Sequence, residues 1–150
     1  MGARYGAAMD ARTVKITRIY AGDDGQSHFE DLWVPLEENV NHPSPAMVGR
    51  SVGFMAGLPA EDMSFRVTPP GGDHPFHASP GRSLAVTTTG MLELGVGDGS
   101  TRRFGPGDLL LLDEQGQGQG HTSRELAPRL TVNISIPVSF DLTPFRTPPS

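Results

Sequence analysis

The stretch from residue 84 to residue 112, LAVTTTGMLELGVGDGSTRRFGPGDLLLL, decides the fold class. Its apolar residues recur at every second position or in short runs bounded by glycine or proline, which is typical of β-strands. We therefore expect strands over residues 84–89, 91–96 and 108–112. The GDGS sequence predicts a hairpin turn into residues 101–104, because Asp-Gly readily adopts tight turns. FGPGD predicts a second tight turn, in which Asp108 is a turn residue.

The same pattern extends to both sides of this stretch. It predicts further strands over residues 13–20, 28–35, 48–56, 63–68 and 130–137. In the last of these, Leu130, Val132, Ile134 and Ile136 alternate with polar residues. We expect the apolar face to be core, and the polar face to be surface, subunit contact or pocket. Short strands without a long amphipathic helix predict an all-β sandwich or barrel.

The length of 150 residues predicts one domain over residues 1–150, with a core of about 13–140 between a flexible N-terminal arm and a flexible C-terminal tail. Two segments, 37–48 and 114–121, are polar or glycine-rich and are predicted to be loops. They either border the mouth of a pocket or are ordinary surface loops.

Composition excludes several classes of function. The net charge is −5 and no cluster of Lys and Arg is present, which argues against nucleic acid as a partner. No apolar run is long enough for a membrane span or a signal peptide, so we expect a cytoplasmic protein without a membrane partner. The absence of cysteine excludes thiolate chemistry and Cys-type metal sites.

Two of the five histidines lie three residues apart, in GGDHPFHASP at residues 71–80. Pro75 and Pro80 exclude a helix here, so the segment is extended. His74 and His77 either lie in a loop by accident, or an extended segment aims at least one ring into a pocket.

Together these segments resemble a small single-domain bacterial cupin over residues 14–137. The resemblance rests on VKITRIYAGDDGQSHFEDLWVPL at 14–36 and on HASPGRSLAVTTTGMLELGVGDGSTRRFGPGDLLLLDEQGQGQGH at 77–121. The second segment is similar to an H-x-A-P-x-R-Q-like motif followed by a G-E-x-E hairpin, F-G-P-G-D and a closing G-x-G-H. The resemblance implies a cupin jelly-roll barrel, also called a double-stranded β-helix.

Cupins typically hold one metal ion on two histidines and a carboxylate spaced i, i+2 and i+6, with a third histidine from a second motif. His77 matches the first position and His121 matches the second-motif histidine. Ser79 and Ser83 occupy the other two positions, and hydroxyls are poor ligands for the usual metals. The expected cofactor is therefore none or one divalent metal ion, held by His77, His121 and His74 if it binds.

Three functions follow as hypotheses. The first is a non-redox cyclase, isomerase or lyase in which His77 and His121 act as the catalytic acid–base pair, since imidazole both accepts and donates protons near neutral pH. The second is a metal-dependent dioxygenase, and the third is a non-catalytic small-molecule binding protein. We favour the first; the resemblance to stand-alone bacterial cupins also suggests secondary-metabolite biosynthesis.

The expected partner is a small, largely apolar substrate with a carbonyl or carboxylate group. We predict that Arg82, Ser79, Ser83, Phe76 and Thr87 bind it, with Arg82 pairing with any anionic group. Arg66 is the other candidate for that role, but we interpret it as an ordinary surface or salt-bridged arginine. The resemblance also implies a homodimer formed through N-terminal strands, with His28 in strand pairing or the dimer contact.

Overall fold

The computed structural model describes residues 12–40 and 43–148, and in these residues the protein is all-β. Its strands are β1 (Thr13–Ala21), β2 (Ser27–Pro35), β3 (Glu37–Glu38), β4 (Phe54–Met55), β5 (Met63–Thr68), β6 (Asp73–His77), β7 (Ser83–Gly95), β8 (Thr101–Phe104), β9 (Leu109–Asp113) and β10 (His121–Ser135). Two 3₁₀ turns, η1 (Pro45–Met47) and η2 (Thr143–Phe145), complete the described elements. The all-β prediction is confirmed. The predicted N-terminal arm, residues 1–11, lies outside the described residues.

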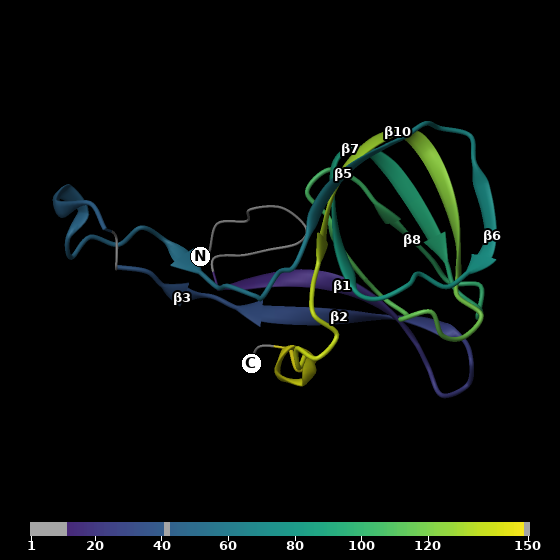
Figure 1. The fold of residues 1–150 in the computed structure, drawn as a ribbon, viewed down its shortest axis with the longest axis horizontal. Helices are drawn as coiled ribbons and strands as arrows, with labels where there is room; N and C mark the ends of the chain where they lie inside the picture. Colours follow the sequence, from purple (N-terminus) through teal and green to yellow (C-terminus); the bar gives the residue numbers. More distant parts are fainter. Residues whose placement is uncertain (1–11, 41–42, 149–150) are drawn as a thin grey trace.

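Eight strands form one mixed sheet, in the order β2-β1-β9-β7-β10-β5, with β6 on β10 and β8 on β7. The pair β1–β9 is parallel, whereas β1–β2 and the pairs made by β7 and β10 are antiparallel. Figure 1 shows β5 to β8 and β10 curving around one end of the molecule, with β1 and β2 beneath them. In the described residues the hydrogen-bonded order does not close on itself. No helix in this part of the chain is long and apolar enough to cross a membrane.

The leucine run of β9 separates two parts of the core. Leu110 belongs to a buried cluster with Ile19, Leu92 and Leu94, whereas Leu111 belongs to a second cluster on the opposite face of the strand. Successive strand residues point to opposite faces, so a strand covered on both sides reads as a continuous apolar run. The second cluster consists of Ile16, Leu32, Val34, Leu111, Ile136 and Leu142. Because Leu142 is part of it, ordered packing extends beyond the predicted core boundary at residue 140.

The two strands predicted over residues 84–89 and 91–96 are one strand, β7, from Ser83 to Gly95. Gly90 lies within β7 at a φ of 89°. A Cβ atom at this position would lie 2.2 Å from the carbonyl oxygen of Pro128, so glycine is required for β10 to approach. Both predicted turns are confirmed: β7 pairs with β8 through the GDGS turn, and the Gly105 N–H donates to the Asp108 carboxylate.

The prediction for residues 130–137 is wrong in its extent and in part of its orientation. The strand β10 begins at His121 and ends at Ser135. Leu130, expected in the core, is 36% exposed, whereas Thr131, on the polar face, is 1% exposed. The apolar partners of this face on β5, Met63, Phe65 and Val67, are also exposed. The polar face of β10 therefore faces inward.

The predicted strand over residues 48–56 is reduced to Phe54–Met55, which pairs with Glu37–Glu38 in a two-stranded sheet. Figure 1 shows this pair on an arm that extends away from the main sheet. Of the remaining residues, Gly53 and Val52 form backbone hydrogen bonds with Asn39, and none of residues 48–53 and 56 belongs to a strand. In the described part of the 37–48 segment, residues 39–40 and 43–48 are irregular apart from η1, as expected of a loop.

Candidate functional site

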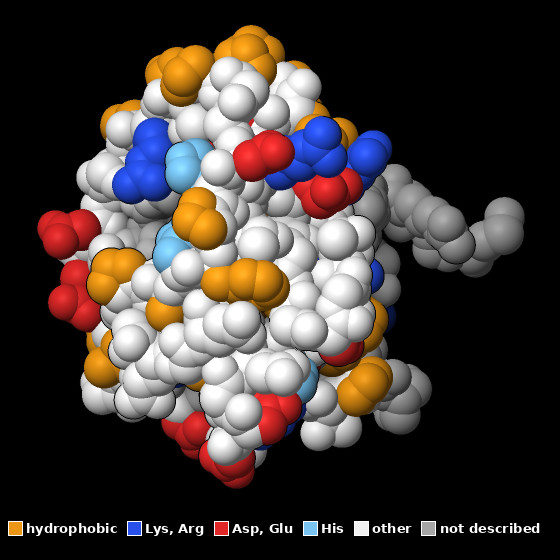
Figure 2. Space-filling view, turned by 90° about the vertical axis from the view of Figure 1, so that its right-hand side faces the viewer, with side chains coloured by type: hydrophobic (Ala, Val, Ile, Leu, Met, Phe, Trp, Pro, Cys, Tyr) orange, Lys and Arg blue, Asp and Glu red, His pale blue; other side chains and the backbone are white. Residues whose placement is uncertain are grey.

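The site lies in a cavity of about 320 Å³ between β5, β6, β7, β9 and β10. One wall is apolar and belongs to the first core cluster: Ala85, Leu92, Leu94, Leu110 and Leu112. The rest is polar and contains Arg66, Thr68, His74, His77, Ser79, His121, Ser123, Glu125, Arg129, Thr131 and Asn133. Figure 2 shows histidine and Lys or Arg side chains next to each other on the face that carries β6. Polar groups set against an apolar wall can fix the orientation of a small ligand.

Six of the polar residues come from the inward face of β10. They are His121, Ser123, Glu125, Arg129, Thr131 and Asn133, all at odd positions of one strand. A period of two places such residues on one face. Glu125 and Arg129 form a buried bidentate ion pair, with N···O distances of 2.8 and 2.7 Å. This pair leaves the middle of the cavity wall without an uncompensated charge.

A bulge explains how two histidines three residues apart share the cavity. His77 pairs with His121 and His74 with Ser123, so three steps along β6 match two steps along β10. The extra residue on β6 reverses the alternation of side chains, as β-bulges do. His74 and His77 therefore both line the cavity, with ring centroids 6.2 Å apart.

Gly120 brings the His77 and His121 rings together. Its φ is 84°, and a Cβ atom here would lie 2.0 Å from the carbonyl carbon and oxygen of His77. Only glycine permits this approach of the two backbones. The rings of His77 and His121 consequently lie 4.7 Å apart, centroid to centroid.

A buried carboxylate orients His121. Glu114 is 1% exposed and His121 is 3% exposed. Glu114 Oε1 accepts hydrogen bonds from His121 Nδ1 at 2.7 Å and from the Ser79 N–H at 3.0 Å, and Oε2 accepts one from the Ser27 hydroxyl. Burial raises the pKa of the Glu114 carboxyl, but the hydrogen bonds from His121, Ser27 and Ser79 lower it by more. Glu114 is therefore an anion at neutral pH.

These contacts define which ring nitrogen is available to a ligand. An ionised Glu114 only accepts, so His121 Nδ1 carries the hydrogen and Nε2 carries the lone pair in the neutral ring. In the same way, His77 Nδ1 lies 2.7 Å from the Pro75 carbonyl oxygen, which also only accepts. Both Nε2 atoms are thus free of protein hydrogen bonds in the described residues. Two adjacent imidazoles with free Nε2 atoms are suited to accept a proton at one place and donate it at another.

The three histidines predicted to hold a metal ion are only partly brought together. His74 Nδ1 is 3.2 Å from the Ser123 hydroxyl oxygen, and its ring is farther from His77 than His121 is. Among the described residues, no three His, Asp or Glu side chains are grouped so that they would hold a metal ion. We therefore derive no step through a metal.

The predicted substrate-binding residues do not all reach the cavity. Ser79 lies on its wall, but Arg82, Ser83, Phe76 and Thr87 are not among the lining residues. Thr87 is buried and Phe76 is exposed. Ser83 pairs with Leu112 and Ser135 at the start of β7. His28 forms an ion pair with Asp24 and also lies away from the cavity.

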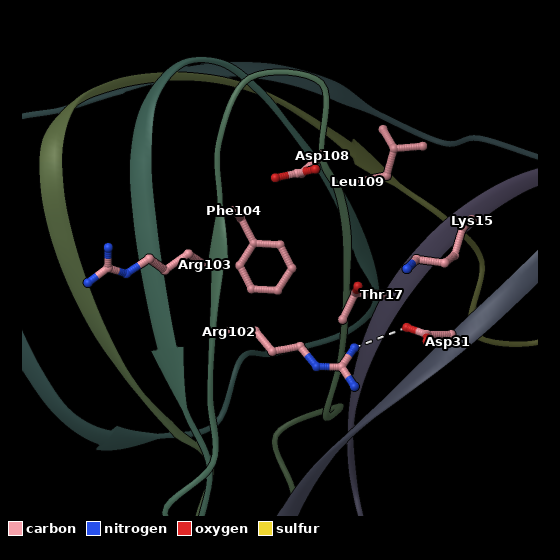
Figure 3. Close-up of a pocket in the computed structure, with 8 residues that line it drawn as sticks. All are labelled: Lys15, Thr17, Asp31, Arg102, Arg103, Phe104, Asp108 and Leu109. Carbon is pink, nitrogen blue, oxygen red and sulfur yellow. Dashed lines mark hydrogen bonds and ion pairs between the residues drawn. The ribbon is translucent and has the colours of Figure 1, made fainter. Parts of the chain in front are cut away.

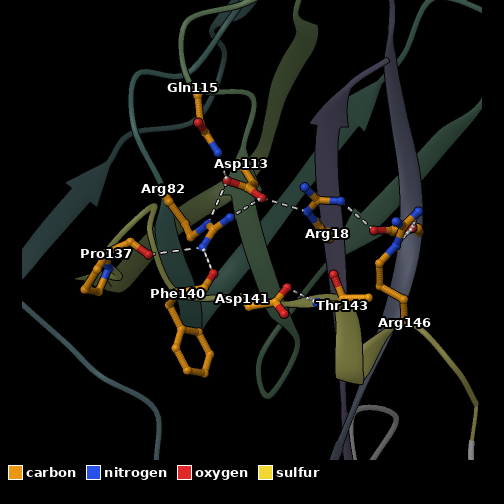
Figure 4. A network of polar contacts seen from close by, with 10 residues as sticks. Arg18, Arg82, Asp113, Gln115, Pro137, Phe140, Asp141, Thr143 and Arg146 are labelled. Atoms are coloured by element: carbon orange, nitrogen blue, oxygen red, sulfur yellow. Dashed lines mark hydrogen bonds and ion pairs between the residues drawn. The ribbon is translucent and has the colours of Figure 1, made fainter. Parts of the chain in front are cut away.

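Arg82 is committed to a buried network instead of a ligand (Figure 4). Its Nε and Nη2 donate to Asp113 at 2.8 and 3.2 Å, and its Nη1 donates to the carbonyl oxygens of Pro137 and Phe140. Arg18 also donates to Asp113, at 2.7 Å. The network joins β9, β1 and the residue before β7 to the C-terminal segment. These contacts account for the burial of Arg82, which does not line the cavity of the candidate site.

A larger hollow, of about 540 Å³, lies over β1, β2 and β8 (Figure 3). Its cations already have partners. Arg102 pairs with Asp31 at 3.0 Å, Arg103 pairs with Glu93 at 3.0 Å, and Lys15 lies over the Trp33 ring. It contains no histidine. We therefore favour the smaller cavity, where the groups capable of chemistry converge.

Sequence reasoning missed Glu114, Glu125, Arg129 and Asn133 as site residues. Glu114 follows directly after β9, where no alternation indicates its direction. The β10 residues did carry a signal, namely polar residues at alternate positions from 121 onward.

Comparison with known proteins assigns no family: no family model matches the chain, and no curated protein matches it significantly.

Proposed function

We propose that this chain is a small-molecule enzyme with a cupin-like barrel, a non-redox isomerase, cyclase or lyase that moves a proton with His77 and His121. The observation that carries the proposal is the adjacent His77–His121 pair on the cavity wall, with His121 oriented by buried Glu114. The curved sheet and the cupin-like motifs of residues 77–121 support the barrel.

In the proposed step, His121 Nε2 takes a proton from the carbon next to the substrate carbonyl. The electron pair of the C–H bond moves into the enolate, and Glu114 balances the charge that forms on the ring. Protonated His77 then gives its Nε2 proton to the enolate, at another atom than the one that lost it. The substrate is rearranged without oxidation or reduction, and a second proton exchange restores both rings.

Phenylpyruvate is a suitable first probe, because it combines an apolar ring, a carbonyl and a carboxylate. We expect the protein to accelerate exchange of its C3 hydrogens in D₂O, followed by NMR. His121→Gln and His77→Gln should each reduce the rate about 100-fold or more, since a positioned acid or base contributes 10²–10⁴-fold. His28→Gln, a histidine outside the cavity, is the matched control and should keep the parent rate. Equal rates in all four proteins would disprove the proposed step, as would no acceleration by the parent.

A further inference from the structure

We infer that Arg66 is the anion-binding residue of this cavity and that the natural ligand is a small monocarboxylate with an apolar body. This inference names the substrate class for the proposed function and rests on it. It reverses the sequence-based assignment, in which Arg82 binds the anion and Arg66 is an ordinary surface arginine.

Arg66 differs from the other arginines near the cavity in having no acid beside it. Arg66 lies on β5, opposite Thr131 of β10, and lines the cavity. Within the described residues its guanidinium forms no ion pair and no hydrogen bond, whereas Arg129 is held by Glu125 and Arg124 pairs with Asp73. A planar guanidinium with free N–H groups binds carboxylate in a bidentate manner.

Asn133 adds a second donor on the same wall. Its Nδ2 donates to the Thr131 hydroxyl oxygen at 3.1 Å. An amide nitrogen carries two hydrogens, so one remains for a ligand. Arg66 and Asn133 therefore present N–H groups to the β5 side of the cavity.

Charge and size limit the ligand further. Arg66 and Arg129 are the cations of permanent charge on the cavity wall, and Glu125 neutralises Arg129. One uncompensated positive charge favours a monoanion over a dianion. A volume of about 320 Å³ is at the lower end for small-molecule sites. The five aliphatic residues of the apolar wall favour an apolar body.

The anion-binding residue and the proton-transfer residues lie on different elements of the cavity wall. The carboxylate binds at β5, whereas His77 and His121 lie where β6 meets the start of β10. Arg66 thereby positions the substrate and takes no part in proton transfer.

The test is binding of carboxylates that cannot react: 3-phenylpropionate, cinnamate and hexanoate, each compared with its primary amide by isothermal titration or ligand-observed NMR. We expect at least one carboxylate to bind about tenfold or more tightly than its amide. Arg66→Gln should abolish that difference, and Arg66→Lys should restore part of it. Arg50→Gln, an exposed arginine outside the cavity, is the matched control and should leave it unchanged.

Added NaCl should weaken carboxylate binding and leave amide binding unchanged, because an exposed cation is screened. Carboxylates that bind no better than their amides, or a preference that survives Arg66→Gln, would overturn the inference. The outcome is independent of turnover. Binding that depends on Arg66 in a protein without proton-transfer activity would refute the proposed chemistry and keep the anion site.

Discussion

Asp113 and Glu114 are adjacent, buried carboxylates with different surroundings. Asp113 is surrounded by Arg82, Arg18 and Gln115, whereas Glu114 is surrounded by His121, Ser27 and the Ser79 N–H. Burial raises the pKa of each carboxyl, and hydrogen bonds lower both pKa values by more. Two of the partners of Asp113 are arginines, which are permanent cations, and neither lines the cavity of the candidate site. One partner of Glu114 is His121, which does line that cavity.

This difference separates a structural role from a chemical one. Arginine does not release its proton in proteins, so the Asp113 network only holds elements together. An imidazole that is fixed by a carboxylate at Nδ1 retains a reactive Nε2. Burial of a carboxylate is therefore not enough to indicate a catalytic site; the kind of partner decides.

Replacing Asp113 should produce the largest loss of stability. Asp113→Asn leaves Arg82 buried without its counter-ion, which typically costs about 3–5 kcal/mol. Urea unfolding at pH 7 measures this cost. Asp31→Asn removes the partner of Arg102 in a more exposed ion pair and is the matched control, with an expected cost of at most about 1 kcal/mol. A loss of stability in Asp113→Asn as small as in the control would show that the network contributes little.

Glu114→Gln should destabilise the protein less, by about 1–3 kcal/mol. Three donors point at the carboxylate, but a glutamine presents one accepting oxygen, so at least one donor faces its NH₂ group. The same change should reduce the exchange of phenylpyruvate at least tenfold, because Nδ1 of His121 loses its fixed acceptor. Histidine ¹⁵N NMR checks the tautomer directly. An unchanged tautomer and rate would remove Glu114 from the mechanism.

Lowering the pH should remove the stabilisation that both carboxylates give to the folded protein. Their pKa values are lowered in the folded protein, so their stabilisation is present above the unfolded values, near pH 4, and is lost as the pH falls through the folded values. For each group, the free energy of unfolding falls by at most about 1.4 kcal/mol per pH unit. Asp113→Asn should therefore have a lower free energy of unfolding than the parent at pH 7, and this difference should become smaller at pH 3. Urea unfolding at both values tests this; a constant difference would contradict it.

The sequence predicts what depends on local pattern. Strand periodicity locates β1, β2 and β5 nearly to the residue, and the GDGS turn follows from two residues. The first half of β10 is harder to predict, because Pro128 interrupts the pattern and the polar residues point inward to a cavity. The roles of Arg66 and Arg82 are not local. Asp113, which neutralises Arg82, is 31 residues away, and β10, which places Arg66 on the cavity, is farther still.

The two histidines of the site should differ in stability as the two carboxylates do, but by less. His121 is buried and bonded to Glu114, so His121→Gln should cost about 1–3 kcal/mol. His77 is exposed, and within the described residues the one hydrogen bond of its side chain is to the Pro75 carbonyl, so His77→Gln should change stability by less than about 0.5 kcal/mol. Urea unfolding measures both. A stable His77→Gln protein that no longer exchanges phenylpyruvate would assign His77 a chemical role, because lost structure would not explain the lost rate. A loss of stability in His77→Gln as large as in His121→Gln would instead make His77 part of the structural framework and remove the contrast on which its catalytic role rests.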